Sequence, residues 1–152
     1  MTDFSPREIV SELDRFIVGR VTRISPEAPV PVVLHDHDEV RLGGAANVAH
    51  NIAALGGTAR LVGVVGPDED GRVLRASLEA RHLDAAGLVT APDRRTTTKA
   101  RVVTTRNQQV ARIDYETDHP LSADTESAVL AAIDQAATGA GVLWPPITAR
   151  AC

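Results

Sequence analysis

The sequence contains few aromatic residues. Only 3% of its 152 residues are Phe, Trp or Tyr, although 43% are hydrophobic, so a core must be built from Val, Leu, Ile and Ala. That mixture is typical of buried parallel strands covered by helices with small side chains. The length suits one ordinary domain, and the composition therefore favours a globular α/β fold.

Cysteine and long hydrophobic runs are scarce as well. The single cysteine is Cys152, which excludes a disulfide within the chain and any metal site built from several thiolates. The first residues include Asp3, Glu8 and Glu12 and contain no long apolar run. They resemble neither a signal peptide nor a membrane span, so we expect a cytoplasmic, soluble protein that does not contact membranes.

Excess charge of one sign is also missing. The formal net charge is -4, and acidic and basic residues are interspersed along the chain. No basic stripe is available to neutralise a nucleic-acid backbone. The charge pattern therefore argues against nucleic acid as a partner.

The first third of the chain predicts a helix, a loop and a hairpin. Residues 5–18 begin with Ser-Pro and place apolar side chains on one helical face, which indicates a short amphipathic helix. Residues 25–31 contain three prolines and predict an extended loop. Residues 32–34 and 40–42 predict two short strands joined by a polar turn at 36–39.

The rest of the chain alternates between helices and strands. Gly43-Gly44 precedes a helix with apolar residues at a spacing of 3.6, and Gly56-Gly57 ends it. That alternation is typical of half a doubly wound sheet. After Thr138 the pattern ends. The other predicted elements are strands at 60–65, 88–89, 96–104 and 110–115, a turn at Asn107, and helices capped by Asp68 and Ser122.

The segment from Gly43 to Asn47, Gly-Gly-Ala-Ala-Asn, is the strongest candidate for a binding site. The two glycines allow a ligand to approach the backbone closely, and the start of the helix offers unpaired N–H groups. Asn47 can both donate and accept hydrogen bonds, which suits a polyhydroxylated ligand. Taken alone, the five residues are better interpreted as a simple turn in which Asn47 acts as a cap.

A longer register links this segment to a known family. From Gly43 to Gly66 the spacing of glycines and Asn47 resembles the first signature of PfkB-family carbohydrate kinases. Residues 23–32, 98–102 and 106–109 resemble the heptose 7-phosphate kinases of that family, which serve ADP-heptose and lipopolysaccharide core synthesis. The resemblance covers residues 20–138.

The resemblance implies a fold and a site. It implies an incomplete ribokinase-like, Rossmann-type sheet with a small β-sheet lid, and a sugar bound between them that ATP and Mg²⁺ phosphorylate. The substrate would be a small sugar phosphate, and the lid could join two copies in a dimer. On this basis the sugar-binding residues are Asp14, Gly43, Gly44 and Asn47, and the cations that meet the substrate's phosphate are Lys99, Arg101 and Arg112. The charge pattern alone supports a solvated strand face for these three cations equally well.

Both ends of the chain depart from the family pattern. Residues 1–19 resemble the start of the ATPase subunit of the HslUV protease, with a predicted helix in place of the family's first strand. Residues 139–152 match neither. The family's Gly-Ala-Gly-Asp motif, which supplies the general base, and its nucleotide-binding loops are missing, so we assign no catalytic residue and expect no useful kinase rate.

Two further motifs resemble binding sites but are weaker, and two rival functions stay open. Residues 66–73 have the glycine spacing of a P-loop, but three carboxylates there would repel phosphate. His35 and His37 could face the same side and bind a metal ion, but no third ligand is evident. A solvated turn is therefore the better interpretation. The rival functions are a non-catalytic assembly partner of a full-length kinase and a recombinant reading frame without function.

Overall fold

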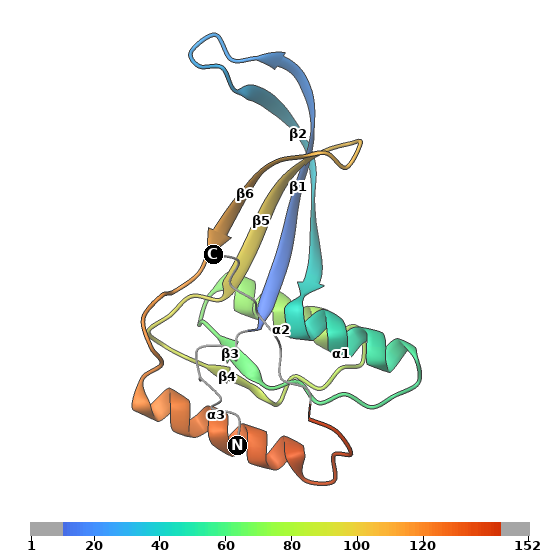
Figure 1. Ribbon diagram of the computed structural model, residues 1–152, viewed down its shortest axis with the longest axis vertical. Helices are drawn as coiled ribbons and strands as arrows, with labels where there is room; N and C mark the ends of the chain where they lie inside the picture. The colour runs from blue at the N-terminus through green and yellow to red at the C-terminus, as the bar shows by residue number, and fades with distance from the viewer. Residues whose placement is uncertain (1–10, 144–152) are drawn as a thin grey trace.

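Four strands form a long sheet that rises from a base of helices and short strands in the computed structural model, which describes residues 11–143 (Figure 1). We call this sheet the lid sheet. Its order is β2 (Pro31–Gly43), β1 (Glu12–Ile24), β5 (Thr97–Thr104) and β6 (Gln109–Tyr115). β1 is parallel to β5, while the β1–β2 and β5–β6 pairs are antiparallel.

The base contains three helices and a small parallel sheet. The helices are α1 (Gly44–Ala54), α2 (Glu69–Glu79) and α3 (Ala123–Ala137), and β3 (Gly63–Val65) pairs with β4 (Leu88–Thr90). Successive side chains of a strand point to opposite faces. Val65 accordingly belongs to a buried cluster with Leu74 of α2, and Val64 to one with Val129 of α3. Helices thus cover both faces of the small sheet.

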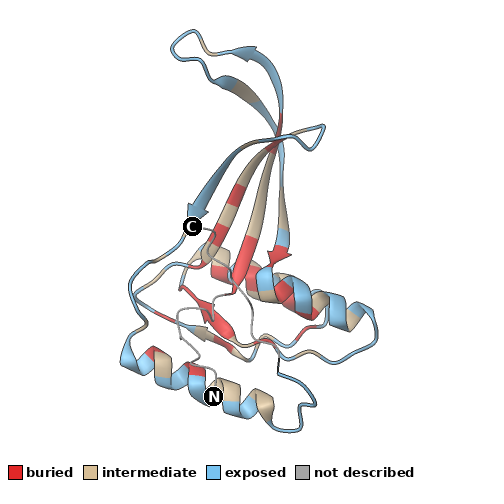
Figure 2. Ribbon diagram, in the orientation of Figure 1, coloured by how far each residue is buried: buried red, intermediate tan, exposed pale blue. Residues whose placement is uncertain are grey.

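The larger apolar cluster holds the foot of the lid sheet to the base. Leu13 of β1 lies beside Leu42 of β2, and both pack in a cluster with Leu74 and Leu78 of α2. Leu13, Leu74 and Leu78 are fully buried. Burying each such side chain contributes about 1.5–3 kcal/mol. Figure 2 shows buried positions at the lower ends of the lid strands and exposed positions along the β1–β2 hairpin above them.

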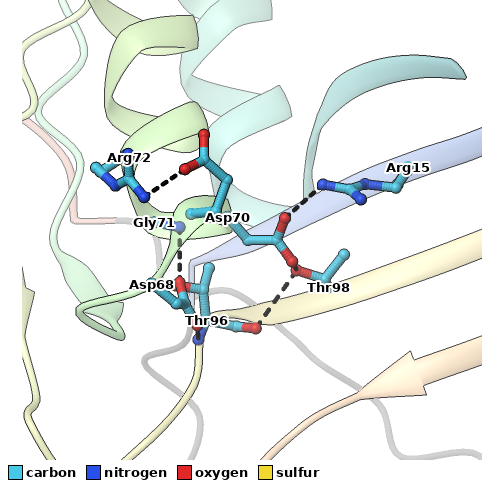
Figure 3. Close-up of polar contacts among 8 residues, drawn as sticks. Arg15, Asp68, Asp70, Gly71, Arg72, Thr96 and Thr98 are labelled. Carbon is cyan, nitrogen blue, oxygen red and sulfur yellow. Dashed lines mark hydrogen bonds and ion pairs between the residues drawn. The ribbon is translucent and has the colours of Figure 1, made fainter.

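A polar contact reinforces this attachment. Asp70, in the first turn of α2, accepts hydrogen bonds from Arg15 Nη2 of β1 at 2.7 Å and from Thr98 Oγ1 of β5 at 2.8 Å (Figure 3). Two neighbouring lid strands are therefore fixed to the same helix turn.

Asp68 makes a second link between α2 and β5. Its carboxylate caps α2 by accepting from the Gly71 N–H, and it also accepts from the N–H and the hydroxyl of Thr96 (Figure 3). Burial alone would raise the pKa of Asp68, but the hydrogen bonds from Thr96 and Gly71 outweigh it and lower the pKa below its usual 3.8. The charged carboxylate is thus part of the folded structure.

The predicted helix at residues 5–18 is wrong over its described part. Residues 5–10 lie outside the described residues, and β1 begins at Glu12 and continues to Ile24. The same letters fit a strand as well, because the β-branched and aromatic residues Phe16, Ile17 and Val18 favour one. β1 pairs with β2 on one side and β5 on the other, and this pairing overrides the helical pattern.

The predicted hairpin within residues 32–42 is also wrong. These residues form one continuous strand, β2, whose partner is β1, and the proline-rich loop at 25–30 connects the two strands. The polar residues 35–38 are exposed along the edge of the lid sheet instead of forming a turn. The predicted strand at 60–65 is shorter than expected, since only Gly63–Val65 is a strand and Arg60 forms an isolated bridge with Asp84.

The other predicted elements are confirmed. Asp68 and Ser122 cap α2 and α3, and Asn107 has a positive φ of 59° between β5 and β6. Residues 139–143 of the predicted non-matching tail belong to neither a helix nor a strand, and the rest of that tail, residues 144–152, lies outside the described residues. Across residues 11–143, none of the helices has the length and apolarity needed to cross a bilayer.

Candidate functional site

The Gly43-Gly44 pair forms the junction between β2 and α1. Gly43 is the N-cap of α1 in an extended conformation, and Gly44 follows with φ of 47°, a left-handed conformation that favours glycine. The Gly43 cap provides no side-chain hydrogen bond, and the first turn carries no acidic residue. The N–H groups at this helix start are therefore left for another partner.

Asp14 lies directly beside this junction. In the β1–β2 register Glu12 is opposite Gly43, and Asp14 is opposite Arg41. A Cβ atom on Gly43 would lie 3.1 Å from Asp14 Oδ2 and 3.1 Å from Glu12 Oε1. A side chain at position 43 would be in tight contact with these two carboxylates, so glycine leaves them room to lie against the start of the helix.

Glu12 is a site residue that the sequence analysis missed. It is only 8% exposed, and it lies on the same side of β1 as Asp14, two residues earlier. The signal was the spacing of Glu12 two residues before Asp14, which places both on one face of a strand. It becomes informative only when the segment is known to be a strand.

The predicted phosphate-binding cations are each held by a carboxylate. Lys99 Nζ donates to Glu12 Oε2 at 2.5 Å, and Arg101 donates to Asp14 Oδ1. Arg112 forms an ion pair with Asp114, Nε to Oδ1 at 2.9 Å. Charge-assisted pairs of this kind fix the long cationic side chains in one orientation.

The structure brings most of the predicted residues to one region. Asp14, Gly43, Lys99 and Arg101 meet at the foot of the lid sheet, through the β1 register with β2 and β5 and the ion pairs above. Gly44 and Asn47 belong to the first turn of α1 that begins there, and Asn47 is exposed. Arg112 lies one strand farther out, on β6, opposite Arg101.

A cavity of about 370 Å³ opens on the face of the lid sheet that carries Phe16, and we call it the lid cavity. Its lining includes Phe16, His37, Arg41 and Arg101. Hydrogen bonds to Asp36 and to Glu39 raise the pKa of His37 above its usual 6.5. The lid cavity thus combines an aromatic ring with groups that carry positive charge.

The P-loop-like segment at the start of α2 does not suit the phosphates of a nucleotide. The first turn of α2, at the P-loop-like glycine spacing, presents Glu69 and Asp70 behind the capping Asp68, and these carboxylates repel phosphate. No group of three or more His, Cys, Asp or Glu side chains is placed to hold a metal ion within residues 11–143. His35 and His37 instead contact Asp38, Asp36 and Glu39 on the exposed edge strand.

The curated proteins that this chain resembles include several bifunctional HldE proteins. One relative, the bifunctional protein HldE of Gluconobacter oxydans, is 53% identical over 111 residues, covering 72% of this chain and 23% of its own length. HldE of Azorhizobium caulinodans is 43% identical over 145 residues, covering 93% of this chain and 30% of the relative. The chain therefore spans less than a third of the length of these curated relatives.

Solved structures agree on the fold. A ribokinase from Thermotoga maritima superposes with a TM-score of 0.53 at 20% identity, covering 70% of this chain and 34% of that one. The fold is thus a partial ribokinase-like α/β fold, as predicted.

The family match covers most of the chain. The model of the pfkB family carbohydrate kinases matches residues 9–138, a range that includes the Gly43–Asn47 junction and every strand of the lid sheet. The predicted likeness of residues 1–19 to the HslUV ATPase subunit finds no support in these comparisons, and the family match already starts at residue 9. From its family match, its relatives and its fold, the chain belongs to the PfkB family of carbohydrate kinases.

Proposed function

We propose that this chain is the sugar-binding part of a kinase domain that acts on heptose 7-phosphate. Residues 23–32, 98–102 and 106–109 support this substrate through their resemblance to heptose 7-phosphate kinases. In the parent family that activity belongs to ADP-heptose and lipopolysaccharide core synthesis.

The observation that carries the proposal is the contact between Asp14 and Gly43 at the start of α1. Sugar hydroxyls both donate and accept hydrogen bonds. Asp14 and Glu12 supply acceptors next to Gly43, and the uncapped N–H groups of α1 supply donors. Asn47 adds a side chain with both capacities in the first turn. Acceptors and donors thus converge where a polyhydroxylated ligand can reach both.

The cations of the lid sheet support a phosphorylated sugar. Lys99 and Arg101 are less than one-third exposed and are already oriented by Glu12 and Asp14. An ammonium or guanidinium group can share its remaining donors with phosphate oxygens. Lys99, Arg101 and Arg112 therefore remain our proposed contacts for the sugar phosphate.

ATP and Mg²⁺ would supply the transferred phosphoryl group in the parent family. We propose that the described residues bind and orient the sugar and provide no general base, because Asp14 and Asp114 are engaged by Arg101 and Arg112.

An assembly role is the second candidate. Exposed apolar side chains near the tip of the β1–β2 hairpin, Ile24 at 60% and Val30 at 52%, favour contact with another lid. The predicted dimer through the lid stays a prediction.

Calorimetry with heptose 7-phosphate tests the sugar site. Replacing Asn47 by Ala removes one hydrogen bond to a ligand hydroxyl, worth about 0.5–1.5 kcal/mol, so the dissociation constant should rise about 2- to 13-fold. Asn51→Ala is the matched control, since Asn51 is also exposed and lies one turn later on α1. Equal affinities of the two variants would contradict the assignment, and absence of binding by the unmodified chain would favour the rival without function.

A further inference from the structure

We infer that Glu12 is a specificity-determining residue of the proposed sugar site, because its charge cancels that of Lys99 and disfavours phosphate beside the start of α1. The inference rests on the proposed function and refines it. Glu12 was not selected in the sequence analysis, and only the pairing of β1 with β2 brings it opposite Gly43.

The two carboxylate oxygens of Glu12 have different neighbours. Oε2 accepts from Lys99 Nζ at 2.5 Å, while Oε1 lies 3.1 Å from the position that a Cβ atom on Gly43 would occupy. The start of α1 has no side-chain cap and no acidic residue in its first turn, and a helix start carries partial positive charge. Glu12 thus lies between two sources of positive charge, the Lys99 ammonium group and the start of the helix.

The register of β1 with β5 balances the charges of this region. Glu12 is opposite Thr97, so its bond to Lys99 runs diagonally between the strands. Asp14 is opposite Lys99 and reaches Arg101 along the same diagonal. The foot of the lid sheet therefore carries two carboxylates and two cations whose charges cancel. Removing the charge of Glu12 alone would leave one carboxylate against two cations.

The position of Glu12 favours a role in binding over a role in the core. Leu13 points to the opposite face of β1 and is fully buried in the apolar cluster. The side chains of Glu12 and Lys99 are 11% and 29% exposed, so the ion pair borders the surface. Buried ion pairs contribute little net stability, because desolvation offsets their attraction. The charge of Glu12, in contrast, acts directly on any ligand beside Gly43.

This charge separates the two kinds of group on a sugar phosphate. A phosphate monoester carries about −1.5 to −2 charges at neutral pH, and the carboxylates of Glu12 and Asp14 repel it. A sugar hydroxyl is neutral, so it can accept from the N–H groups of α1 and donate to Glu12 Oε1. Glu12 therefore favours hydroxyls over phosphate beside Gly43, and it selects the orientation in which a sugar phosphate binds.

Calorimetry with two ligands, heptose and heptose 7-phosphate, tests the inference. Glu12→Gln keeps the shape of the side chain and an acceptor oxygen but removes the charge. It should tighten binding of heptose 7-phosphate about tenfold, because the charge of Lys99 is then no longer cancelled. It should not tighten binding of heptose. Glu69→Gln is the matched control, since Glu69 is ion-paired with Arg72 on α2, and it should leave both affinities unchanged.

Lys99→Gln separates the effect of charge from a change in packing. In the Glu12→Gln background it should abolish the gain in affinity for heptose 7-phosphate. In the unmodified chain it should cost less affinity, because Glu12 already engages Lys99. An equal loss in both backgrounds would overturn the inference, and so would a Glu12→Gln variant that binds heptose 7-phosphate no more tightly than the unmodified chain does.

NMR of the unmodified chain gives a test that needs no variant. Inorganic phosphate up to about 1 mM should leave the side-chain signals of Lys99 unshifted, because Glu12 cancels its charge. A saturable shift in that range would refute the inference even if Glu12→Gln does not fold.

Inorganic phosphate also separates this inference from the proposed function. If only the inference fails, heptose 7-phosphate binds and Asn47→Ala weakens its binding, but Glu12→Gln does not strengthen it. If only the proposed function fails, neither sugar binds the unmodified chain, yet Glu12→Gln gains an affinity for inorganic phosphate that depends on Lys99.

Discussion

At the scale of single residues, carboxylates on β1 control the cations of the lid. Glu12 and Asp14 each accept from a cation on β5, and a Cβ atom at position 43 would lie 3.1 Å from an oxygen of each carboxylate. In the proposed site an incoming phosphate would share Lys99 and Arg101 with these carboxylates, so we expect Glu12 and Asp14 to lower its affinity. Arg41 has a different partner, Glu39, on its own strand.

His37 should titrate at a higher pH than an ordinary histidine. Hydrogen bonds to Asp36 and Glu39 stabilise its protonated form and raise its pKa above 6.5. The folded pKa then exceeds the unfolded one, so the stabilising effect is complete below about pH 6.5 and is lost as the pH rises through the folded pKa. NMR titration of the imidazole carbon-bound protons measures this directly.

The Glu39→Gln variant is the control for this titration. Removing the Glu39 charge should lower the His37 midpoint, because the Glu39 contact contributes to the raised pKa. A midpoint at or below 6.5 in the unmodified chain would contradict the assigned contacts.

At the scale of elements, the first turn of α2 couples the base to the lid sheet. Asp68 caps the helix and also binds the backbone and hydroxyl of Thr96, which immediately precedes β5. Asp70, two residues later in the same turn, accepts hydrogen bonds from Arg15 of β1 and Thr98 of β5. The orientation of the lid therefore depends on this turn as much as on the apolar cluster around Leu13.

Asp68→Ala should destabilise the fold. Loss of an N-cap costs about 0.5–2 kcal/mol, and we expect the upper part of that range because Thr96 also loses its partner. Ser122→Ala removes the N-cap of α3. The Ser122 hydroxyl contacts only Thr125 in the first turn of the same helix, so this variant should lose less stability than Asp68→Ala. Urea unfolding of both variants makes the comparison, and an equal or smaller loss for Asp68→Ala would refute the coupling.

The carboxylate of Asp68 also makes the stability of the fold depend on pH. The folded pKa of Asp68 is lower than the unfolded value of 3.8. Its contribution to stability is therefore present above about pH 4 and is lost as the pH falls through the folded pKa. In the Asp68→Ala variant the decline in stability over this acidic range should be shallower.

At the scale of the whole molecule, the chain should bind sugar without phosphorylating it. Phosphoryl transfer needs a base and donors around the transferring group. In the described residues Asp14 and Asp114 are ion-paired on the lid and are not free to act as a base. A coupled assay of ADP release with heptose 7-phosphate should show no sugar-dependent turnover.

The assay requires protein from a host that lacks its own heptose kinase, with a reaction without sugar as background. Turnover near roughly 1–100 s⁻¹, the usual range for kinases, would show that this chain builds a catalytic site from residues to which we assign other roles.

The sequence alone was sufficient for the features that depend on local chemistry. Glycines at 43 and 44 predicted the junction into α1, Asp68 and Ser122 predicted two helix starts, and the three prolines at 25–31 predicted the loop between β1 and β2. Each of these signals acts through the backbone of its own residue or its immediate neighbours, so it can be seen without the rest of the fold. The resemblance to the PfkB signature from Gly43 to Gly66 could likewise be seen in the sequence, because it depends only on the spacing of residues along the chain.

Only the tertiary structure decided what β1 and β2 are. Residues 12–18 carry apolar side chains that suit a helix as well as a strand, and the choice depends on hydrogen bonds to residues 31–43 and 97–104, far away in the sequence. The roles of Glu12 and Arg41 depend on that choice, because cross-strand register determines which side chains share a face of the sheet. The lid cavity follows for the same reason: its cations come from separate strands, and pairing between distant segments brings them over Phe16.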